Sequence, residues 1–217
     1  MDLKGKKILF LGDSITEGWG ASSIEKTYWS LLSSVDGAAV RAYGIGGTRI
    51  ARQIVPSCEP KYDRNFVSRV GEMENGADCV VVFGGTNDYG HGDAPLGSFD
   101  DRTDSTFYGA LHSLFLALLQ KYPEARIVVM TPLHRERENC LVNEAGVRNV
   151  GTLSDYVRII KEVARHYALP VLDLYSLSGI QPDVPFLRER YAPDGLHPND
   201  SGHERIYALL REFLRTL

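Results

Sequence analysis

Short apolar runs recur along the chain and are separated by segments in which apolar residues are spaced differently. Most of these runs are nearly continuous, which is typical of strands covered on both faces, as in a parallel sheet. The run over residues 39–42 is the weakest because it contains an arginine. We expect five strands, over residues 8–11, 39–42, 80–83, 127–130 and 171–174.

The segments between these runs have helical spacing. Apolar residues recur at i, i+3, i+4, i+7 and i+8 from Leu111 to Leu119, and similar stripes occupy residues 157–164 and 206–213. Weaker helices are expected over residues 28–34 and 65–73. Strands that alternate with helices predict right-handed β-α-β units. We therefore expect an α/β fold: a three-layer α/β/α sandwich built on a flavodoxin-like, doubly wound sheet of about five parallel strands.

Length and charge narrow the class of protein. A chain of 217 residues fits one domain, spanning residues 1–217. A net charge of −4, with no basic run longer than Lys6-Lys7, predicts no nucleic-acid partner. The three cysteines form no metal-ligand pattern and are expected to be reduced. The first apolar run is too short for an export signal or a membrane span, which predicts a cytoplasmic protein.

Candidate chemistry follows the expected strands. In an open parallel sheet, ligands bind beyond the carboxyl ends of the strands. The first three strands lead into polar, glycine-rich turns, and a fourth such segment precedes the last helix. Taken singly, each could be an ordinary turn or helix cap, because Gly, Asn, Asp and Ser favour both. The four segments are residues 12–18, 44–48, 84–88 and 194–200.

Together these segments hold the parts of a serine nucleophile site. Ser14 lies in a sharp strand-to-helix turn that would expose its hydroxyl. Asp194, three residues before His197, could bind the imidazole Nδ1 proton and leave Nε2 to accept the Ser14 proton. The amides of Ser14 and Gly47 and the side chain of Asn87 could stabilise an oxyanion. Since Gly46 adjoins Gly47, either glycine could be the donor.

The order of these blocks resembles that of the SGNH (GDSL-type) hydrolases. Gly12-Asp13-Ser14 resembles the family's nucleophile block, and Asp194 with His197 resembles its Asp-x-x-His block. Gly47 and the segment 85–88 match the oxyanion glycine and the asparagine block. The resemblance covers residues 12–200. It implies supporting roles for Asp13 and Asp88, and a reaction that uses neither a metal nor an organic cofactor.

The resemblance implies a serine esterase that acts through an acyl-enzyme. We expect a small-molecule ester substrate with a short acyl group, such as acetyl, on a carbohydrate or another small polar alcohol. Lysophospholipase or thioesterase activity, acyl transfer to an acceptor alcohol, and a non-enzymatic flavodoxin-like binding module are the alternatives. The sequence leaves the oligomeric state open. Two aperiodic stretches, 89–103 and 133–151, are candidate walls of the site. They hold Tyr89, His91, His134, Arg135 and Arg137, which could contact a polar alcohol or sugar or could equally be solvated loop residues.

Overall fold

The computed structural model describes residues 1–142, 146 and 151–217. Five parallel strands form one sheet in the order β2-β1-β3-β4-β5, which is the flavodoxin-like order. The expected α/β fold, with a doubly wound parallel sheet, is therefore confirmed. The strands are β1 (Lys7–Gly12), β2 (Ala39–Gly44), β3 (Cys79–Phe83), β4 (Arg126–Met130) and β5 (Val171–Leu172).

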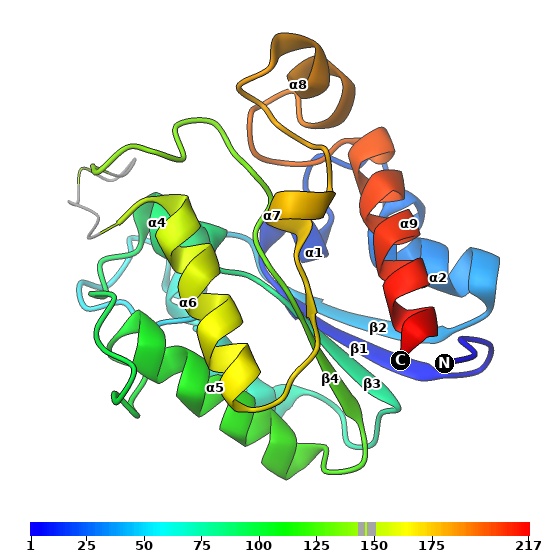
Figure 1. Cartoon of the computed structure of the whole chain (residues 1–217), viewed down its shortest axis with the longest axis horizontal. Helices are drawn as coiled ribbons and strands as arrows, with labels where there is room; N and C mark the ends of the chain where they lie inside the picture. The colour runs from blue at the N-terminus through cyan, green and yellow to red at the C-terminus, as the bar shows by residue number, and fades with distance from the viewer. Residues whose placement is uncertain (143–145, 147–150) are drawn as a thin grey trace.

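Helices cover both faces of the sheet (Figure 1). Successive side chains of a strand point to opposite faces, so Leu9 and Leu11 join one apolar core while Ile8 and Phe10 join the other. The first core is covered by α3 (Phe66–Arg69), α5 (Phe107–Lys121) and α6 (Leu153–His166). The second is covered by α2 (Tyr28–Asp36) and α9 (Asp200–Thr216).

Shorter helices lie mainly at the carboxyl ends of the strands. Two of them carry candidate site residues: α1, which follows β1, begins at Ser14, and α4, which follows β3, contains Asn87 and Asp88. The short α-helices are α1 (Ser14–Glu17), α4 (Thr86–His91), α7 (Leu174–Leu177) and α8 (Pro185–Tyr191). The 3-10 helices within the described ranges are η1 (Ile24–Lys26), η2 (Pro60–Asp63) and η3 (Val70–Glu72).

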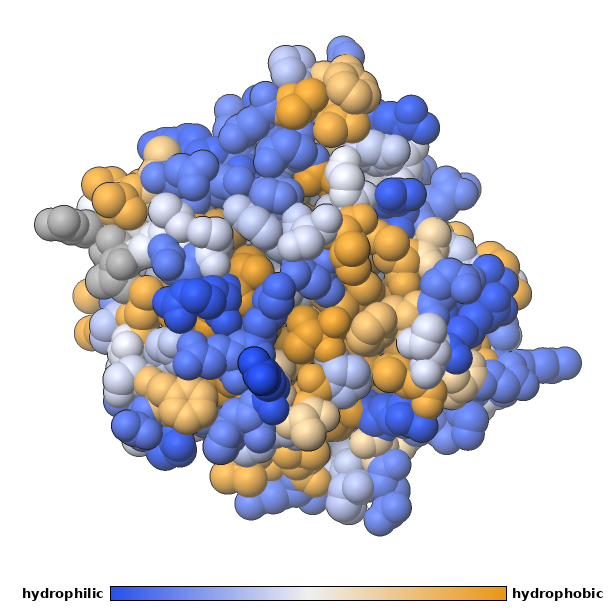
Figure 2. All heavy atoms as spheres, in the orientation of Figure 1, coloured by the Kyte–Doolittle hydropathy of each residue, from blue (hydrophilic) through white to orange (hydrophobic). Residues whose placement is uncertain are grey.

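The surface is mixed in character. Figure 2 shows polar side chains spread over the helices, with apolar side chains gathered between α6 and α9. Among the described residues, no helix has both the length and the apolar character needed to cross a bilayer.

Several predicted boundaries were wrong. The strand expected over residues 171–174 ends at Leu172, because the Asp173 carboxylate accepts a hydrogen bond from the Ser176 amide and starts α7. The helix expected over residues 65–73 is α3 followed by the 3-10 turn η3. The stretch 89–103, expected to be irregular, begins inside α4. Of the stretch 133–151, residues 143–145 and 147–150 lie outside the described residues.

Candidate active site

The candidate residues meet at the carboxyl edge of the sheet. The strand order reverses between β1 and β3, and such a switch point is where ligands bind in open α/β sheets. Ser14 follows β1, Gly47 follows β2 and Asn87 lies in α4 beyond β3. These three residues line one cavity of about 860 Å³ together with His197, which precedes α9.

Ser14, His197 and Asp194 form a continuous hydrogen-bonded row. Ser14 Oγ lies 3.0 Å from Nε2 of His197. On the other side of the ring, Nδ1 lies 2.6 Å from Oδ2 of Asp194. The second carboxylate oxygen accepts hydrogen bonds from the Leu196 and His197 amides, at 2.9 Å and 2.7 Å. The three side chains therefore have the spacing that proton transfer from a serine hydroxyl needs.

The charge on Asp194 sets the tautomer of His197. Partial burial opposes ionisation of Asp194, but hydrogen bonds from the His197 ring and from two backbone amides hold its pKa below the usual value. An ionised carboxylate can only accept hydrogen bonds, so Nδ1 of His197 carries a proton. In the neutral ring, Nε2 then has a free lone pair, and this atom faces Ser14 Oγ.

The turn that carries Asp194 requires a glycine. Gly195 has φ of +83°, a left-handed conformation that side chains disfavour, and a Cβ here would lie 2.8 Å from Oε2 of Glu136. The Gly195 carbonyl accepts a hydrogen bond of 2.8 Å from the Glu136 amide. The loop that follows β4 thus holds the Asp194 turn in place.

The backbone amides of two residues that line the cavity are candidates for binding a ligand. Within the described residues, the amides of Ser14 and Gly47 donate no hydrogen bond. The Gly46 amide, in contrast, donates to Oε2 of Glu17 at 2.6 Å. Gly47 has φ of +74°, and a Cβ on it would lie 2.8 Å from the Tyr62 ring. Of the two adjacent glycines, Gly47 is therefore the one whose N–H remains available to a ligand.

The Asn87 side chain is held at both of its polar atoms. Its Nδ2 donates to the Thr48 carbonyl at 3.0 Å, which uses one of the two amide hydrogens. Its Oδ1 lies 3.1 Å from Nε2 of His91. The second Nδ2 hydrogen remains for a ligand in the cavity that Asn87 lines.

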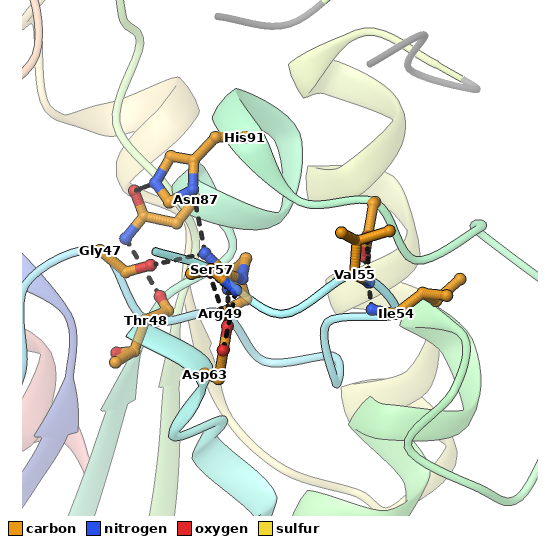
Figure 3. Close-up of polar contacts among 10 residues, drawn as sticks. Gly47, Thr48, Arg49, Ile54, Val55, Ser57, Asp63, Asn87 and His91 are labelled. Atoms are coloured by element: carbon orange, nitrogen blue, oxygen red, sulfur yellow. Dashed lines mark hydrogen bonds and ion pairs between the residues drawn. The ribbon is translucent and has the colours of Figure 1, made fainter. Parts of the chain in front are cut away.

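Arg49 also lines this cavity, and no sequence signal pointed to it. Its side chain is 3% exposed and ion-pairs with Asp63 at 2.9 Å. The same guanidinium bonds to the Gly47 carbonyl at 3.2 Å and to Nδ1 of His91 at 3.0 Å (Figure 3). Burial lowers the pKa of His91 to about 4, and the positive charges of Arg49 and Arg135 add to this effect. His91 is therefore neutral near pH 7.

Asp13 and Asp88 bind backbone amides. Asp13 caps α1 by accepting from the Ile15 amide at 3.1 Å. Asp88 accepts from the Ile50 and Ala51 amides, at 2.9 Å and 2.8 Å, and so fixes the loop after β2. Burial raises the pKa of Asp13 to about 7 and that of Asp88 to about 6. Neither carboxyl lines the Ser14 cavity.

The structure places two of the five candidate substrate contacts in the cavity. His91 and Arg135 line the cavity, whereas Tyr89, His134 and Arg137 are not among its lining residues. Tyr89 is buried and its hydroxyl donates to backbone carbonyls of the loop after β4. His134 Nδ1 lies 2.9 Å from the Glu138 carboxylate. Across residues 1–142, 146 and 151–217, no group of three or more His, Cys, Asp or Glu side chains is placed to hold a metal ion.

Residues 10–205 match the model of the GDSL-like lipase/acylhydrolase family. Among solved structures, a Lactobacillus plantarum protein is 31% identical with a TM-score of 0.83, and the match covers 98% of each chain. A Bacteroides uniformis protein assigned to the GDSL-like lipases is 22% identical with a TM-score of 0.71, covering 98% of this chain and 97% of that one. A two-domain esterase active on acetylated mannans is 19% identical with a TM-score of 0.62, covering 99% of this chain and 50% of that one. No curated protein matches the sequence.

Proposed function

The chain belongs to the GDSL-like lipase/acylhydrolase family, and from this premise we propose that it is a serine esterase whose nucleophile is Ser14. The observation that carries the proposal is the row of hydrogen bonds from Ser14 Oγ through the His197 ring to Asp194, at 3.0 Å and 2.6 Å. A binding module would have no use for a hydroxyl aligned with a half-buried imidazole and a carboxylate.

In the proposed reaction, Ser14 Oγ attacks the ester carbonyl carbon while its proton passes to Nε2 of His197. The amides of Ser14 and Gly47 and the free Nδ2 hydrogen of Asn87 bind the oxyanion. As the C–O bond to the alcohol breaks, His197 returns the proton to the leaving oxygen. A water molecule, deprotonated by His197, then releases the acyl group and regenerates the Ser14 hydroxyl.

Asp194 has two functions in this proposal. Its negative charge stabilises the imidazolium that forms when His197 takes the proton, and its hydrogen bond fixes the ring orientation. Its side chain is 54% exposed, so water screens part of this charge. We therefore assign most of its contribution to orientation, which the two amide hydrogen bonds to the same carboxylate reinforce.

For the substrate, we propose a short acyl group, such as acetyl, on a carbohydrate or another small polar alcohol. The cavity, of about 860 Å³, is far larger than an acetyl group and could hold a bulky alcohol. Trp19 and Tyr62 line the cavity. The Trp19 side chain is half exposed, and the centroid of its ring lies 5.3 Å from that of the His197 ring. Such a ring offers a flat apolar face to a sugar. The esterase with a related fold is active on acetylated mannans.

A second candidate function is hydrolysis of esters with longer acyl chains, as in a lysophospholipase or thioesterase. One observation favours it: Val55, which lines the cavity, is 66% exposed, and Ile54 beside it is 61% exposed. An apolar rim of this kind could contact an alkyl chain. A series of p-nitrophenyl esters from acetate to decanoate, followed by a panel of acetylated sugars, separates the two candidates. The proposed substrate predicts that kcat/KM is highest for acetate.

The nucleophile itself is tested by labelling with a fluorophosphonate. We expect one adduct per chain at Ser14, located by peptide mass spectrometry, and none in the Ser14→Ala variant. The variant should also lose turnover of p-nitrophenyl acetate while its circular dichroism stays unchanged. A wild-type protein that takes up no label and turns over no ester would support the binding module instead.

A further inference from the structure

Asn87, one of the proposed oxyanion donors, is connected to a partly buried chain of polar groups, and the catalytic steps proposed above assign this chain no role. The chain runs from Asp63 to Arg49, from Arg49 to His91 and from His91 to Asn87, with separations of 2.9, 3.0 and 3.1 Å (Figure 3). We propose that Arg49 and His91 are positioning residues, which orient the oxyanion donors Asn87 and Gly47. This inference rests on the proposed esterase function.

The direction of every hydrogen bond in this chain follows from the guanidinium. Arginine can only donate, so Nδ1 of His91 accepts from Arg49 and the single ring proton resides on Nε2. Nε2–H then donates, and its partner on Asn87 must be the oxygen, Oδ1. The fixed positive charge of Arg49, in the wall of the same cavity, therefore determines which way the Asn87 amide points.

The opposite orientation of the Asn87 amide would be disfavoured at both ends. A flipped side chain would place its NH₂ against the Nε2–H of His91 and its oxygen against the Thr48 carbonyl. Two donors would then face each other at the partly buried end and two acceptors at the buried end, and hydrogen bonds left unmade away from water are costly. His91 and the Thr48 carbonyl thus leave Asn87 with one orientation, in which an N–H is available to the cavity.

Arg49 also acts on the second donor. Its Nη1 donates to the Gly47 carbonyl at 3.2 Å and so restrains the Gly47–Thr48 peptide, which adjoins the peptide that carries the Gly47 N–H. Arg49 is itself held by the Asp63 carboxylate and by the Ser57 hydroxyl at 3.0 Å. One buried cation is therefore bonded to one proposed donor residue directly and to another through a single imidazole. Preorganised donors of this kind avoid reorganisation during the reaction.

The test compares two amide side chains at position 91. In His91→Gln the terminal NH₂ can occupy the place of Nε2 and still donate to Asn87, whereas in His91→Asn the shorter amide reaches only toward Arg49. We expect His91→Asn to lower kcat for p-nitrophenyl acetate at least about 10-fold with KM changed less than twofold, because an oxyanion donor acts on charge that develops in the transition state. His91→Gln should recover most of this loss.

A double variant shows whether His91 acts through Asn87. Removing one oxyanion donor costs about 100- to 1000-fold in kcat, which is the loss we expect for Asn87→Ala. If His91 only orients Asn87, then His91→Asn in the Asn87→Ala background should lower kcat less than twofold further. The matched control is His166→Phe, at an exposed histidine on α6, which should keep wild-type kcat.

Three results would overturn the inference. His91→Asn could keep kcat within twofold of wild type, His91→Gln and His91→Asn could lose the same activity, or the losses of the double variant could multiply. In all three, Ser14→Ala would still be inactive and the esterase proposal would stand. If Ser14→Ala instead kept the activity of the wild type, the esterase proposal would fail, and the role of Arg49 and His91 would fail with it.

Discussion

Ser22 and Asp200 lie 178 positions apart in the sequence and are joined by two hydrogen bonds. The Ser22 amide donates to Oδ1 of Asp200 at 2.7 Å, and its hydroxyl donates to Oδ2 at 2.6 Å. Ser22 belongs to the loop after α1, and Asp200 is the first residue of α9. The pair therefore links the segment that carries Ser14 to the segment that carries His197.

Breaking this link should affect catalysis more than stability. We expect Asp200→Ala to lower kcat about fivefold, which corresponds to an activation barrier raised by ~1 kcal/mol when Ser14 and His197 are held less firmly together. The melting temperature should change little, because both hydrogen bonds are exposed to water. Steady-state kinetics and thermal melts check this, with the exposed neighbour Ser201→Ala as the control. An unchanged kcat would mean that other contacts hold the two segments together.

Replacing Asp194 by asparagine tests the proposed orientation of the imidazole. The new side-chain amide can present either its oxygen or its NH₂ to Nδ1 of His197, so the correct tautomer is no longer enforced. We expect Asp194→Asn to lower kcat by about 100- to 10,000-fold. This is the range that a general base contributes, and His197 can act as the base only in the correct tautomer. Labelling by fluorophosphonate should slow in parallel. Equal labelling rates in variant and wild type would contradict the role of Asp194.

Alanine substitutions at two glycines with similar backbone angles distinguish the effect of backbone strain on stability from an effect on catalysis. Gly47 and Gly76 have φ of +74° and +71°, and a Cβ on Gly76 would meet nothing within 4 Å. Alanine at either position should cost ~1 kcal/mol of stability from the left-handed backbone. Only Gly47→Ala also brings a Cβ to 2.8 Å from the Tyr62 ring beside the proposed oxyanion site. Urea unfolding should show a loss in both variants, and kinetics a loss of kcat in Gly47→Ala alone.

His203 makes stability depend on pH. Its ring is fully buried against Tyr28, whose amide donates to Nδ1 at 3.3 Å, and burial lowers the pKa of His203 to about 4. Between pH 4 and the ordinary value of 6.5, the unfolded chain therefore binds the proton that the folded chain rejects. This group destabilises the fold as pH falls through that window, by at most about 1.4 kcal/mol per pH unit.

The variant His203→Asn isolates this effect. Its Oδ1 can still accept the Tyr28 amide, but the side chain does not titrate. We expect the free energy of unfolding of the wild type to exceed that of the variant by less at pH 5 than at pH 7, measured in urea. Asp13 and Asp88, whose raised pKa values act in the opposite direction, are present in both proteins and cancel in the difference. A difference that is the same at both pH values would contradict the prediction.

The sequence pattern predicts the fold well where buried apolar residues recur at regular intervals along the chain. The runs of β1, β3 and β4 are buried on both faces, and the stripe from Leu111 to Leu119 follows α5, so their periodicity survives in the structure. The end of β5 was not predictable in this way. Asp173 stands between Leu172 and Leu174, but its hydrogen bond from the Ser176 amide ends the strand and begins α7. Local capping and sheet pairing compete there, and apolar content alone does not decide between them.

The site was partly predictable for a similar reason. Ser14, Gly47, Asn87 and His197 lie beside turns that the sequence marks with glycine or proline, and all four line the cavity. Arg49 carries no such mark. Its partners His91 and Asp63 lie 42 and 14 positions away, so only the folded chain shows that they meet. A buried polar network has no periodicity, and the choice of Gly47 over Gly46 likewise depends on the distant Glu17 carboxylate.

The 183 positions that separate Ser14 from His197 have a consequence for how the protein is made. The hydroxyl leaves the ribosome soon after β1, but the imidazole follows only after a further 183 residues have been synthesised. Contacts between such distant residues form slowly, because the intervening chain must first be ordered. Recovery of fluorophosphonate labelling during refolding should therefore lag behind recovery of helical circular dichroism, and would report the docking of α9 onto α2.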